Sequence, residues 1–452
     1  MRTLYNILFG ILFAVSSPYY FYRMRRRGNW QKGFSQRFGK YDAKVKQAIT
    51  NRHVLWAHAV SVGEVNACTH LIQALESRLP NLKIVVSTTT TTGMGGLQDK
   101  LPTHVSKIYY PIDHRTCVTR ALSTLHPEAI VLVEAEIWPN FLWRARDLGK
   151  PVFLVNARLS EKSYRNYKRF GFLFRPLFAS FTGVGAQNEA DAARLRELGC
   201  RPEAIHVVGS LKFDAAVLHE RSQLDVRALL NQLGVPPGAR VLLGGSTWPG
   251  EELILAKLYL KLKAEFPDLF LVLVPRHFER SRDRGRELES LKLRFAYRNE
   301  IMSHTQFRPS ELDCLLVNTT GELQQFYECA TVAFVGKSLT AQGGQNPIEP
   351  GALGKPMVFG PYMQNFADVV RSFLVGDGAM QVRTEAELES ALRALFADQT
   401  RRDQLGRNAR KVVQDNLGAM ERTVNMIIKH LDAEVLTAVG NRRAGEEDEG
   451  ET

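Results

Sequence analysis

Short apolar segments alternate with amphipathic segments along most of the chain. The apolar segments that predict strands in the first half lie at 54–59, 83–88, 107–110, 129–133, 152–156, 183–186 and 205–208. Between them, residues 64–78, 115–125, 138–148 and 189–198 show the spacing of apolar positions that predicts helices. Strands that are apolar at nearly every position and alternate with helices are typical of a parallel sheet covered on both faces.

The same alternation resumes after a polar stretch, which we expect to hold a hinge near 214–225. Strands are predicted at 241–244, 269–274, 314–317, 332–335 and 356–359, and one long helix at 401–430 could cross back onto the first half. We therefore predict an α/β fold of two facing, Rossmann-like, doubly wound domains at 31–215 and 216–436. Residues 437–452 have nothing to bury, which predicts a disordered tail.

The chain begins with an apolar segment that is followed by a basic one. Residues 4–22 carry no charge, and at about 1.5 Å per residue they just reach across a hydrocarbon core of roughly 30 Å. Nine lysines and arginines, against Asp42 alone, follow between Arg23 and Lys46. A cleavable signal peptide would carry its cations before the apolar segment, and a buried helix would not need the aromatic cluster at 19–22 beside arginines.

A membrane anchor at 1–30, which includes basic juxtamembrane residues, therefore fits this segment best. The positive-inside rule then places the rest of the chain in the cytoplasm. Pro18 and the marginal length leave open a helix that only dips into the bilayer.

The formal net charge of +12 is concentrated beside this apolar segment. Basic proteins often bind nucleic acid, but a basic cluster next to an anchor favours anionic lipid as the partner and no nucleic acid. The five cysteines are scattered and show no CxxC spacing. Their number and spacing argue against disulfides and against a zinc site.

Glu64 lies where the apolar segment 54–59 meets the helix predicted at 64–78. One interpretation is that a helix N-terminus is stabilised by negative charge, by about 0.3–1 kcal/mol. The other is that ligands of open α/β sheets bind at the strand tips, where a carboxylate can act as a general base. Spacing alone does not decide between the two.

Two strand ends in the second half carry groups suited to a phosphate. Residues 244–252 follow a strand and open a helix, which Ser246 or Thr247 would cap, and the amides of that turn could meet an incoming phosphate. Arg276 and His277 end the strand at 269–274. The planar guanidinium of Arg276 suits a phosphate, although a surface ion pair would explain it as well.

Residues 334–356 are the most informative stretch. Gly343 and Gly344 permit close approach of the backbone, and Asn346 and Glu349 then begin a short helix. A glutamate in that first turn could accept both hydroxyls of a ribose. A plain loop would not need so many glycines and prolines, so we favour a ligand site.

Charged groups also follow the strands of the first domain. Glu134 and Glu136 end the strand at 129–133, and alternation should point one of them toward the cleft. Residues 156–176 interleave cations, among them Arg158 and Lys162, with aromatic side chains, which predicts a surface that contacts lipid or a phosphorylated lipid. Lys212 is expected at the edge of the cleft.

Taken in order along residues 37–366, ten segments resemble the Kdo transferases. These glycosyltransferases move 3-deoxy-D-manno-octulosonic acid (Kdo) from CMP-Kdo onto a lipid A precursor. The segments are WAHAVSVGE, STTTTTG, YYPID, EAEIWPN, NARLS, GSLKFD, STWPGEE, PRHFER, TTGEL and FVGKSLTAQGGQNPIEP with FGPYMQNF. Each segment alone is weak evidence, but ten in the same order are specific.

The resemblance implies a GT-B type glycosyltransferase at the cytoplasmic face of the cell inner membrane, with no metal and no other cofactor. Glu64 would correspond to the general base. It would take a proton from the glucosamine 6-hydroxyl of a tetraacyldisaccharide 4'-bisphosphate as that oxygen attacks the anomeric carbon of Kdo, with inversion. Glu136 would support the acceptor side.

The resemblance also implies that CMP-Kdo binds in the C-terminal half. Arg276 would hold the CMP phosphate, aided by the amides near Ser246 and Thr247. Glu349 would bind the ribose. The full set of implied donor residues is Ser246, Thr247, Arg276, His277, Gly344, Asn346 and Glu349, and the implied acceptor or phosphate contacts are Arg158, Lys162 and Lys212.

The chain departs from the family pattern on the donor side. Trp248 and Gln345 stand where the family usually has histidine, and Asn318 stands where aspartate is common. Two alternatives therefore stay open at this point. One is a related GT-B enzyme that uses a UDP-sugar and another lipid, and the other is a non-catalytic, membrane-tethered nucleotide-binding module, which would need neither Glu64 nor Glu136.

Overall fold

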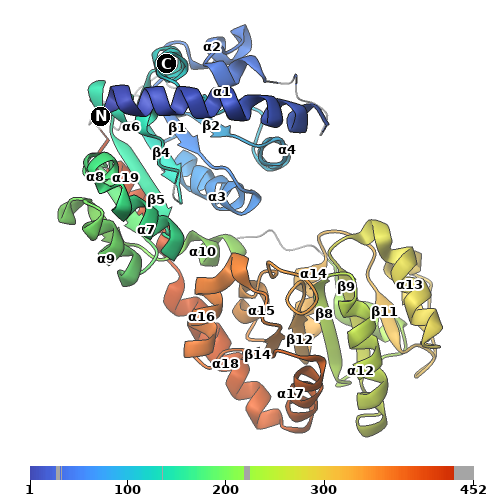
Figure 1. Ribbon diagram of the computed structural model, residues 1–452. Helices are drawn as coiled ribbons and strands as arrows, with labels where there is room; N and C mark the ends of the chain where they lie inside the picture. Colours follow the sequence, from blue (N-terminus) through green and yellow to red (C-terminus); the bar gives the residue numbers. More distant parts are fainter. Residues whose placement is uncertain (27–30, 32, 135, 218–223, 432–452) are drawn as a thin grey trace, which may run out of the picture. The chain divides into compact units, whose positions relative to one another are not determined.

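The computed structural model describes residues 1–26, 31, 33–134, 136–217 and 224–431, and Figure 1 shows it as a ribbon. These residues form two units. Unit 1 comprises Met1–Ala215 and the segment that begins at Gly418, and unit 2 comprises Ala216–Leu417. Each unit is built on its own seven-stranded sheet.

The sheet of unit 1 has the strand order β3-β2-β1-β4-β5-β6-β7, and its neighbouring strands are parallel. Every residue of the central strand β1 is buried, so helices must cover both faces. The strands are β1 Val54–His58, β2 Lys83–Thr88, β3 Ser106–Tyr109, β4 Pro127–Val133, β5 Val152–Ala157, β6 Gly183–Ala186 and β7 Ile205–Val207.

Two separate apolar cores lie on the two faces of this sheet. Helices α5, α6, α8 and α9 pack on one face, where Trp56 and Phe141 are fully buried, and α3, α4 and α19 pack on the other. The helices of unit 1 are α1 Arg2–Arg26, α2 Ala43–Ile49, α3 Val62–Arg78, α4 Thr91–Lys100, α5 Arg115–Leu125, α6 Pro139–Asp147, α7 Glu161–Arg169, α8 Gly171–Phe178, α9 Glu189–Glu197 and α19 Ala419–Ile428. Helix α10, Leu211–Val217, spans the boundary between the units.

The sheet of unit 2 has the order β10-β11-β9-β8-β12-β13-β14, again with parallel neighbours. Its strands are β8 Val241–Thr247, β9 Phe270–Pro275, β10 Phe295–Tyr297, β11 Cys314–Leu316, β12 Val332–Val335, β13 Met357–Phe359 and β14 Met380–Gln381. Its helices are α11 Val226–Gln232, α12 Glu251–Glu265, α13 Ser281–Ser290, α14 Leu323–Cys329, α15 Ile348–Ala352, α16 Ala367–Val375, α17 Glu385–Ala397 and α18 Gln399–Asn416.

The predicted fold class, α/β with two doubly wound parallel sheets, is confirmed. Each predicted strand is present near its expected limits, while the two-to-three-residue edge strands β10 and β14 and the helix α4 were not predicted. The single helix expected at 401–430 is wrong, because Gly418 at φ 85° separates α18 from α19. The tail at 437–452 and half of the hinge expected near 214–225, residues 218–223, lie outside the described residues.

Helix α1 is an apolar helix with its surface exposed. Its segment Arg2–Tyr22 has a mean hydropathy of 1.3, and none of its most apolar residues is buried inside the fold. Among the described residues, it is the one helix long and apolar enough to cross a membrane by length and composition.

Candidate active site

The sheet of unit 1 has a topological switch point between β1 and β4. These neighbouring strands are connected in opposite directions, since β1 leads through α3 to β2 and β4 leads through α6 to β5. Helices α3 and α6 lie on opposite faces of the sheet, so the two connections part at this position. Ligands of open α/β sheets bind at such a point, on the edge formed by the carboxyl ends of the strands.

Glu64 lies at this switch point, in the first turn of α3. Ser61 caps the helix through a hydrogen bond from Glu64 N to Ser61 Oγ at 3.2 Å. The Glu64 side chain turns back and accepts a hydrogen bond from Val60 N at 2.9 Å through Oε2, and the residue is 8% exposed. The helix-start interpretation therefore holds for one oxygen of this carboxylate, and Oε1 accepts no hydrogen bond from the residues that the structure describes.

Glu134 and Glu136 follow β4 on the other side of the same switch point. Burial raises the pKa of Glu136, and the nearby carboxylates of Glu64 and Glu134 raise it further, although Trp138 Nε1 donates to Glu136 Oε2 at 2.8 Å. These carboxylates follow the paired strands β1 and β4, so Glu64 lies near Glu134 and Glu136. The structure thus brings both predicted catalytic residues to one edge of one sheet.

The predicted acceptor contacts are distributed along the same edge. Lys212 Nζ lies 3.9 Å from Glu134 Oε1. Arg158 directly follows β5, the strand beside β4, and Lys162 lies in the first turn of α7. Lys212 is therefore placed against one of the glutamates.

The segment 156–176 divides between core and surface. Tyr164, Tyr167 and Phe174 pack against the core of unit 1, so these aromatics need no lipid to explain them. Phe170 and Phe172 are 46% and 61% exposed. The expected lipid-facing surface is reduced to the turn between α7 and α8.

Unit 2 repeats the arrangement with a switch point between β8 and β12. Strand β8 leads through α12 to β9 on one side, whereas β12 leads to β13 on the other. The predicted donor residues follow β8, β9 and β12, so they converge on the carboxyl edge of this sheet. The amide of Arg276 donates to the carbonyl of Thr247 at 3.0 Å, which ties the ends of β8 and β9 together.

The start of α12 differs from the prediction. Its N-cap is Gly250, so neither Ser246 nor Thr247 caps the helix, and both residues belong to β8. Thr247 Oγ1 instead donates to Glu252 Oε1 at 2.8 Å. Burial raises the pKa of Glu252 to about 7.

Glu251 fills the position at which we expected an incoming phosphate. Its fully buried carboxylate accepts four backbone hydrogen bonds and so joins the β8–α12 turn to the loop after β12. The donors are the amides of Trp248 (2.9 Å), Lys337 (2.7 Å), Ser338 (2.9 Å) and Leu339 (2.9 Å). The Trp248 amide of this turn is therefore already bonded to Glu251 and is not available to an incoming phosphate.

Three side chains at this edge form a chain of ring contacts. The ring of Trp248 lies 4.8 Å from that of His277, edge-on, and Lys337 Nζ lies 4.4 Å from the Trp248 ring centroid. Such a cation–π contact is worth about 0.5–2 kcal/mol. Lys337, to which the sequence analysis assigned no role, thus adds a cation against Trp248, whose ring also contacts His277.

The residues after β12 that were predicted to bind the nucleotide are joined by their own hydrogen bonds. Asn346 Oδ1 accepts from Ile348 N at 3.1 Å, and Asn346 Nδ2 donates to Glu349 Oε1 at 3.0 Å. Burial raises the pKa of Glu349, while Asn346 and the charge of Arg276 oppose the rise, so Arg276 lies near Glu349. Gly344 is required by packing, since a Cβ there would lie 2.5 Å from Met363 Sδ at a φ of 76°.

Backbone strain occurs at both carboxyl edges. Glu134 (φ 64°) and Asn156 (φ 52°) end strands of unit 1, and Ser246 (φ 49°) and Lys337 (φ 53°) do so in unit 2. Non-glycine residues in this region cost on the order of 1–3 kcal/mol and cluster at functional sites. The same edges therefore hold the charged groups and four of the nine non-glycine residues with positive φ in the described part of the chain.

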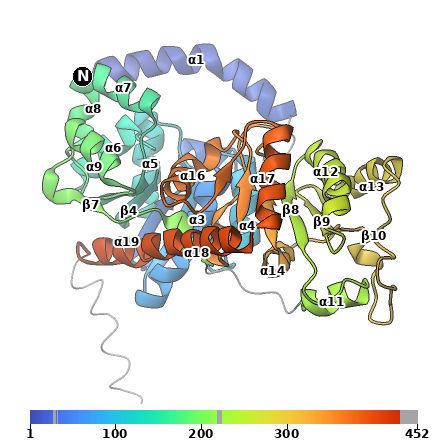
Figure 2. The ribbon, with the colours of Figure 1, turned by 90° about the horizontal axis from the view of Figure 1, so that it is seen from below.

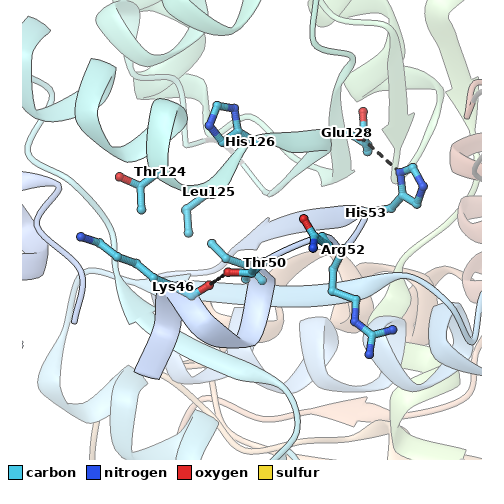
Figure 3. Close-up of a pocket in the computed structure, with 10 residues that line it drawn as sticks. Lys46, Thr50, Arg52, His53, Thr124, Leu125, His126 and Glu128 are labelled. Carbon is cyan, nitrogen blue, oxygen red and sulfur yellow. Dashed lines mark hydrogen bonds and ion pairs between the residues drawn. The ribbon is translucent and has the colours of Figure 1, made fainter. Parts of the chain in front are cut away.

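The hollows at the opposite, amino edges of the sheets lack convergent groups. A hollow of about 520 Å³ in unit 1 is lined by residues of α2, α5 and the start of β1, and Figure 3 shows Lys46, Arg52 and His126 pointing away from one another. Its ion pair joins His53 to Glu128 at 3.3 Å. We do not assign a site there.

A second hollow of about 440 Å³ lies at the amino edge of the unit 2 sheet. Its cations bind the carbonyls that end three helices: Lys355 binds Glu328 O, Arg402 binds Leu395 O and Arg410 binds Leu353 O. Since cations at helix C-termini are stabilised by the helix dipole, this cluster is explained without a ligand.

Solved structures with this fold are known. The UDP-GlcNAc 2-epimerase of Neisseria meningitidis superimposes with a TM-score of 0.55 at 14% identity, covering 83% of this chain and 100% of its own. A glycosyltransferase from Rickettsia africae gives 0.52 at 13% identity, covering 85% and 99%. The two units therefore have the two-domain GT-B fold.

Relatives in sequence are more specific. Residues 32–215 match the family described as 3-deoxy-D-manno-octulosonic-acid transferase. The 3-deoxy-D-manno-octulosonic acid transferase of Haemophilus influenzae is 30% identical over 428 residues, which cover 94% of this chain and 95% of that relative. That of Bordetella pertussis is 33% identical over 414 residues, covering 89% and 93%. The chain belongs to the Kdo transferase family.

Proposed function

We propose that this Kdo transferase moves Kdo from CMP-Kdo, with inversion, to the glucosamine 6-hydroxyl of a tetraacyldisaccharide 4'-bisphosphate lipid A precursor. Membership of the family supports the transferred sugar. The single observation that supports the mechanism is the group of Glu64, Glu134 and Glu136 at the β1/β4 switch point.

In this mechanism the acceptor oxygen attacks the anomeric carbon of Kdo while the bond from that carbon to the CMP phosphate breaks. Glu64 Oε1 takes the hydroxyl proton, since Oε2 is held by Val60 N at 2.9 Å. The bonding electron pair leaves with the phosphate. A base so placed accelerates such a step by roughly 10²–10⁴-fold.

Cations of unit 2 stabilise the charge that develops on the leaving phosphate. Arg276 provides a planar guanidinium, and Lys337 provides an ammonium fixed over Trp248. Glu349, held by Asn346, binds the ribose. Arg158, Lys162 and Lys212 contact phosphate groups of the acceptor.

We further propose that the enzyme acts at the cytoplasmic face of the inner membrane. The apolar helix α1 supports this location, and so does the excess of cations after it, which suits an anionic leaflet.

The direct test is to incubate the full chain with CMP-Kdo and the tetraacylated disaccharide bisphosphate and to weigh the lipid product by mass spectrometry. We expect one or more added Kdo units, bound through the glucosamine 6-oxygen. Unchanged acceptor would contradict the proposal. Because Trp248, Gln345 and Asn318 depart from the family pattern, stronger competition by UDP than by CMP would indicate a UDP-sugar donor instead.

A further inference from the structure

The amino end of α1 is bonded to the folded part of unit 1. Arg2 forms a two-pronged ion pair with Asp147 of α6, with Nη1–Oδ2 and Nη2–Oδ1 distances of 2.6 and 2.8 Å. Its guanidinium also lies 5.5 Å from the centroid of the Trp143 ring. A paired guanidinium over an aromatic ring is a specific contact, not a chance approach of two exposed side chains.

A second set of contacts reaches a buried carboxylate. Tyr5 OH donates to Asp113 Oδ2 at 2.8 Å, and Asn140 Nδ2 donates to Asn6 Oδ1 at 2.9 Å. Asp113 is 3% exposed and also accepts from the amides of Asn140 and Phe141 at 3.0 and 2.9 Å. Removing Tyr5 would take one partner from a buried group, at a cost of about 1–3 kcal/mol.

Aromatic contacts continue along the helix toward its other end. Tyr5, Phe9 and Phe13, spaced four residues apart, stack on one another at 5.8 and 6.2 Å between ring centroids. Near the carboxyl end, Phe21 meets Phe34 of unit 1 at 6.3 Å. Both ends of α1 therefore rest on the same unit, and Figures 1 and 2 show the helix running along it.

The outward face of α1 is apolar. Leu8, Ile11, Leu12 and Val15 are 57%, 59%, 65% and 75% exposed. An apolar face of this size needs a cover. The helix contains no acidic residue, and it exposes Tyr19, Tyr20 and Tyr22 toward its carboxyl end. Exposed apolar and aromatic side chains together with cations fit an anionic leaflet.

A helix that crossed the bilayer could not keep these contacts. From Arg2 to Arg26 an α-helix rises about 36 Å, so a crossing would carry Arg2 beyond a core of roughly 30 Å. Asp147 and Asp113 belong to the folded unit and would stay on the side of the basic segment. All of the bonds made by Arg2, Tyr5 and Asn6 would then break.

We propose that α1 does not cross the membrane but lies in the plane of the cytoplasmic leaflet, bonded along unit 1, with its outward face in the lipid. This inference rests on the membrane location proposed above. It assigns the outward face of α1 to lipid binding.

The test is the side of the membrane from which residue 3 can be labelled. Thr3→Cys is made in a Cys329→Ser background, since the other four cysteines are buried, and Thr103→Cys serves as the control on an exposed loop of the folded unit. A membrane-impermeant maleimide is added to spheroplasts and to inverted membrane vesicles. For both variants we expect labelling that is at least about ten-fold greater in the inverted vesicles, as for a helix that lies on one surface.

Labelling of Thr3→Cys in spheroplasts, with Thr103→Cys labelled only in inverted vesicles, would overturn the in-plane helix while leaving the enzyme at the membrane. Recovery of the full chain in the soluble fraction would instead contradict the proposed location itself. The two failures are therefore distinguishable.

Discussion

Buried carboxylates at the two carboxyl edges differ in the donors that they meet. Glu251 accepts four backbone amides, whereas Glu64 accepts one, through Oε2. Oε2 of Glu252 is buried without a hydrogen-bond partner among the described residues. A carboxylate whose two oxygens both accept hydrogen bonds has a structural role, whereas one with an oxygen that accepts none can exchange a proton with a ligand. Sequence position predicted acids at these turns but not the number of their donors, because three of the four donors of Glu251 come from a loop far along the chain.

Glu252 should make the stability of the protein depend on pH. Burial raises its pKa from 4.5 to about 7, because the ionised carboxylate is less stable in the folded protein than in water. The free energy of unfolding should therefore fall as the pH rises through about 7. Relative to the wild type, Glu252→Gln should therefore gain roughly 1–3 kcal/mol between pH 5 and pH 8.

Urea unfolding of both proteins at the two pH values measures this gain. The exposed Glu328→Gln serves as the control and should show no such change. If the difference in unfolding free energy between Glu252→Gln and the wild type stays constant with pH, the claim that burial raises the pKa of Glu252 is contradicted.

Trp248 should contribute to donor binding through its two neighbours. Trp248→Leu removes the ring that holds Lys337 and contacts His277, so the KM for CMP-Kdo should rise roughly 3- to 30-fold with little change in kcat. Phe266→Leu is a matched control. It also removes a cation–π contact, in which the Arg240 guanidinium lies 5.2 Å from the ring centroid, but this contact is remote from the site. Equal KM values for the two variants would show that Lys337 does not bind the donor.

Elements were predictable where the local pattern is strong. The buried strands could be predicted from their apolar segments. Helix α4 begins with threonines and contains glycines, which are weak helix formers, so its formation depends on tertiary packing that the sequence pattern does not show. The short edge strands β10 and β14 carry too few residues for a pattern. Gly418 separates α18 from α19 because it adopts a left-handed φ of 85°. Helix-forming residues on both sides of it made one continuous helix the simpler prediction.

Two glycines of α4 should respond in opposite ways to the same substitution. A Cβ on Gly93 would lie 2.4 Å from Thr88 Oγ1 and 3.1 Å from Val60 O, whereas a Cβ on Gly95 has nothing within 4 Å. Gly95→Ala should stabilise the protein by about 0.5–1 kcal/mol. Gly93→Ala should destabilise it by about 1–3 kcal/mol and, because Val60 N binds Glu64, should also lower kcat.

Thermal unfolding and transfer rates of the two variants test this contrast. A stabilised and fully active Gly93→Ala would mean that the turn before α3 tolerates displacement, which contradicts the fixed position of Glu64.

At the scale of the whole molecule, the two sheets follow one plan, with charged residues at the switch point of each. The sequence pattern predicts that plan, because strand order in doubly wound sheets follows simple connection rules. The roles of particular residues came from resemblance to a family. The contacts of α1 were beyond prediction, since Arg2 and Asp147 are 145 residues apart and only the folded chain brings them together.

The central claim is that Glu64 is the general base of Kdo transfer. Glu64→Gln keeps an oxygen that can accept the bond from Val60 N, so the fold should be retained, while the proton acceptor is lost. Glu128→Gln, at the opposite edge of the same sheet, is the control.

The most direct measurement is the single-turnover rate of Kdo transfer at saturating CMP-Kdo, together with the dissociation constant of CMP. The account predicts that Glu64→Gln slows transfer by roughly 10²–10⁴-fold with CMP binding unchanged. A transfer rate within a few-fold of the wild type and of Glu128→Gln would contradict it.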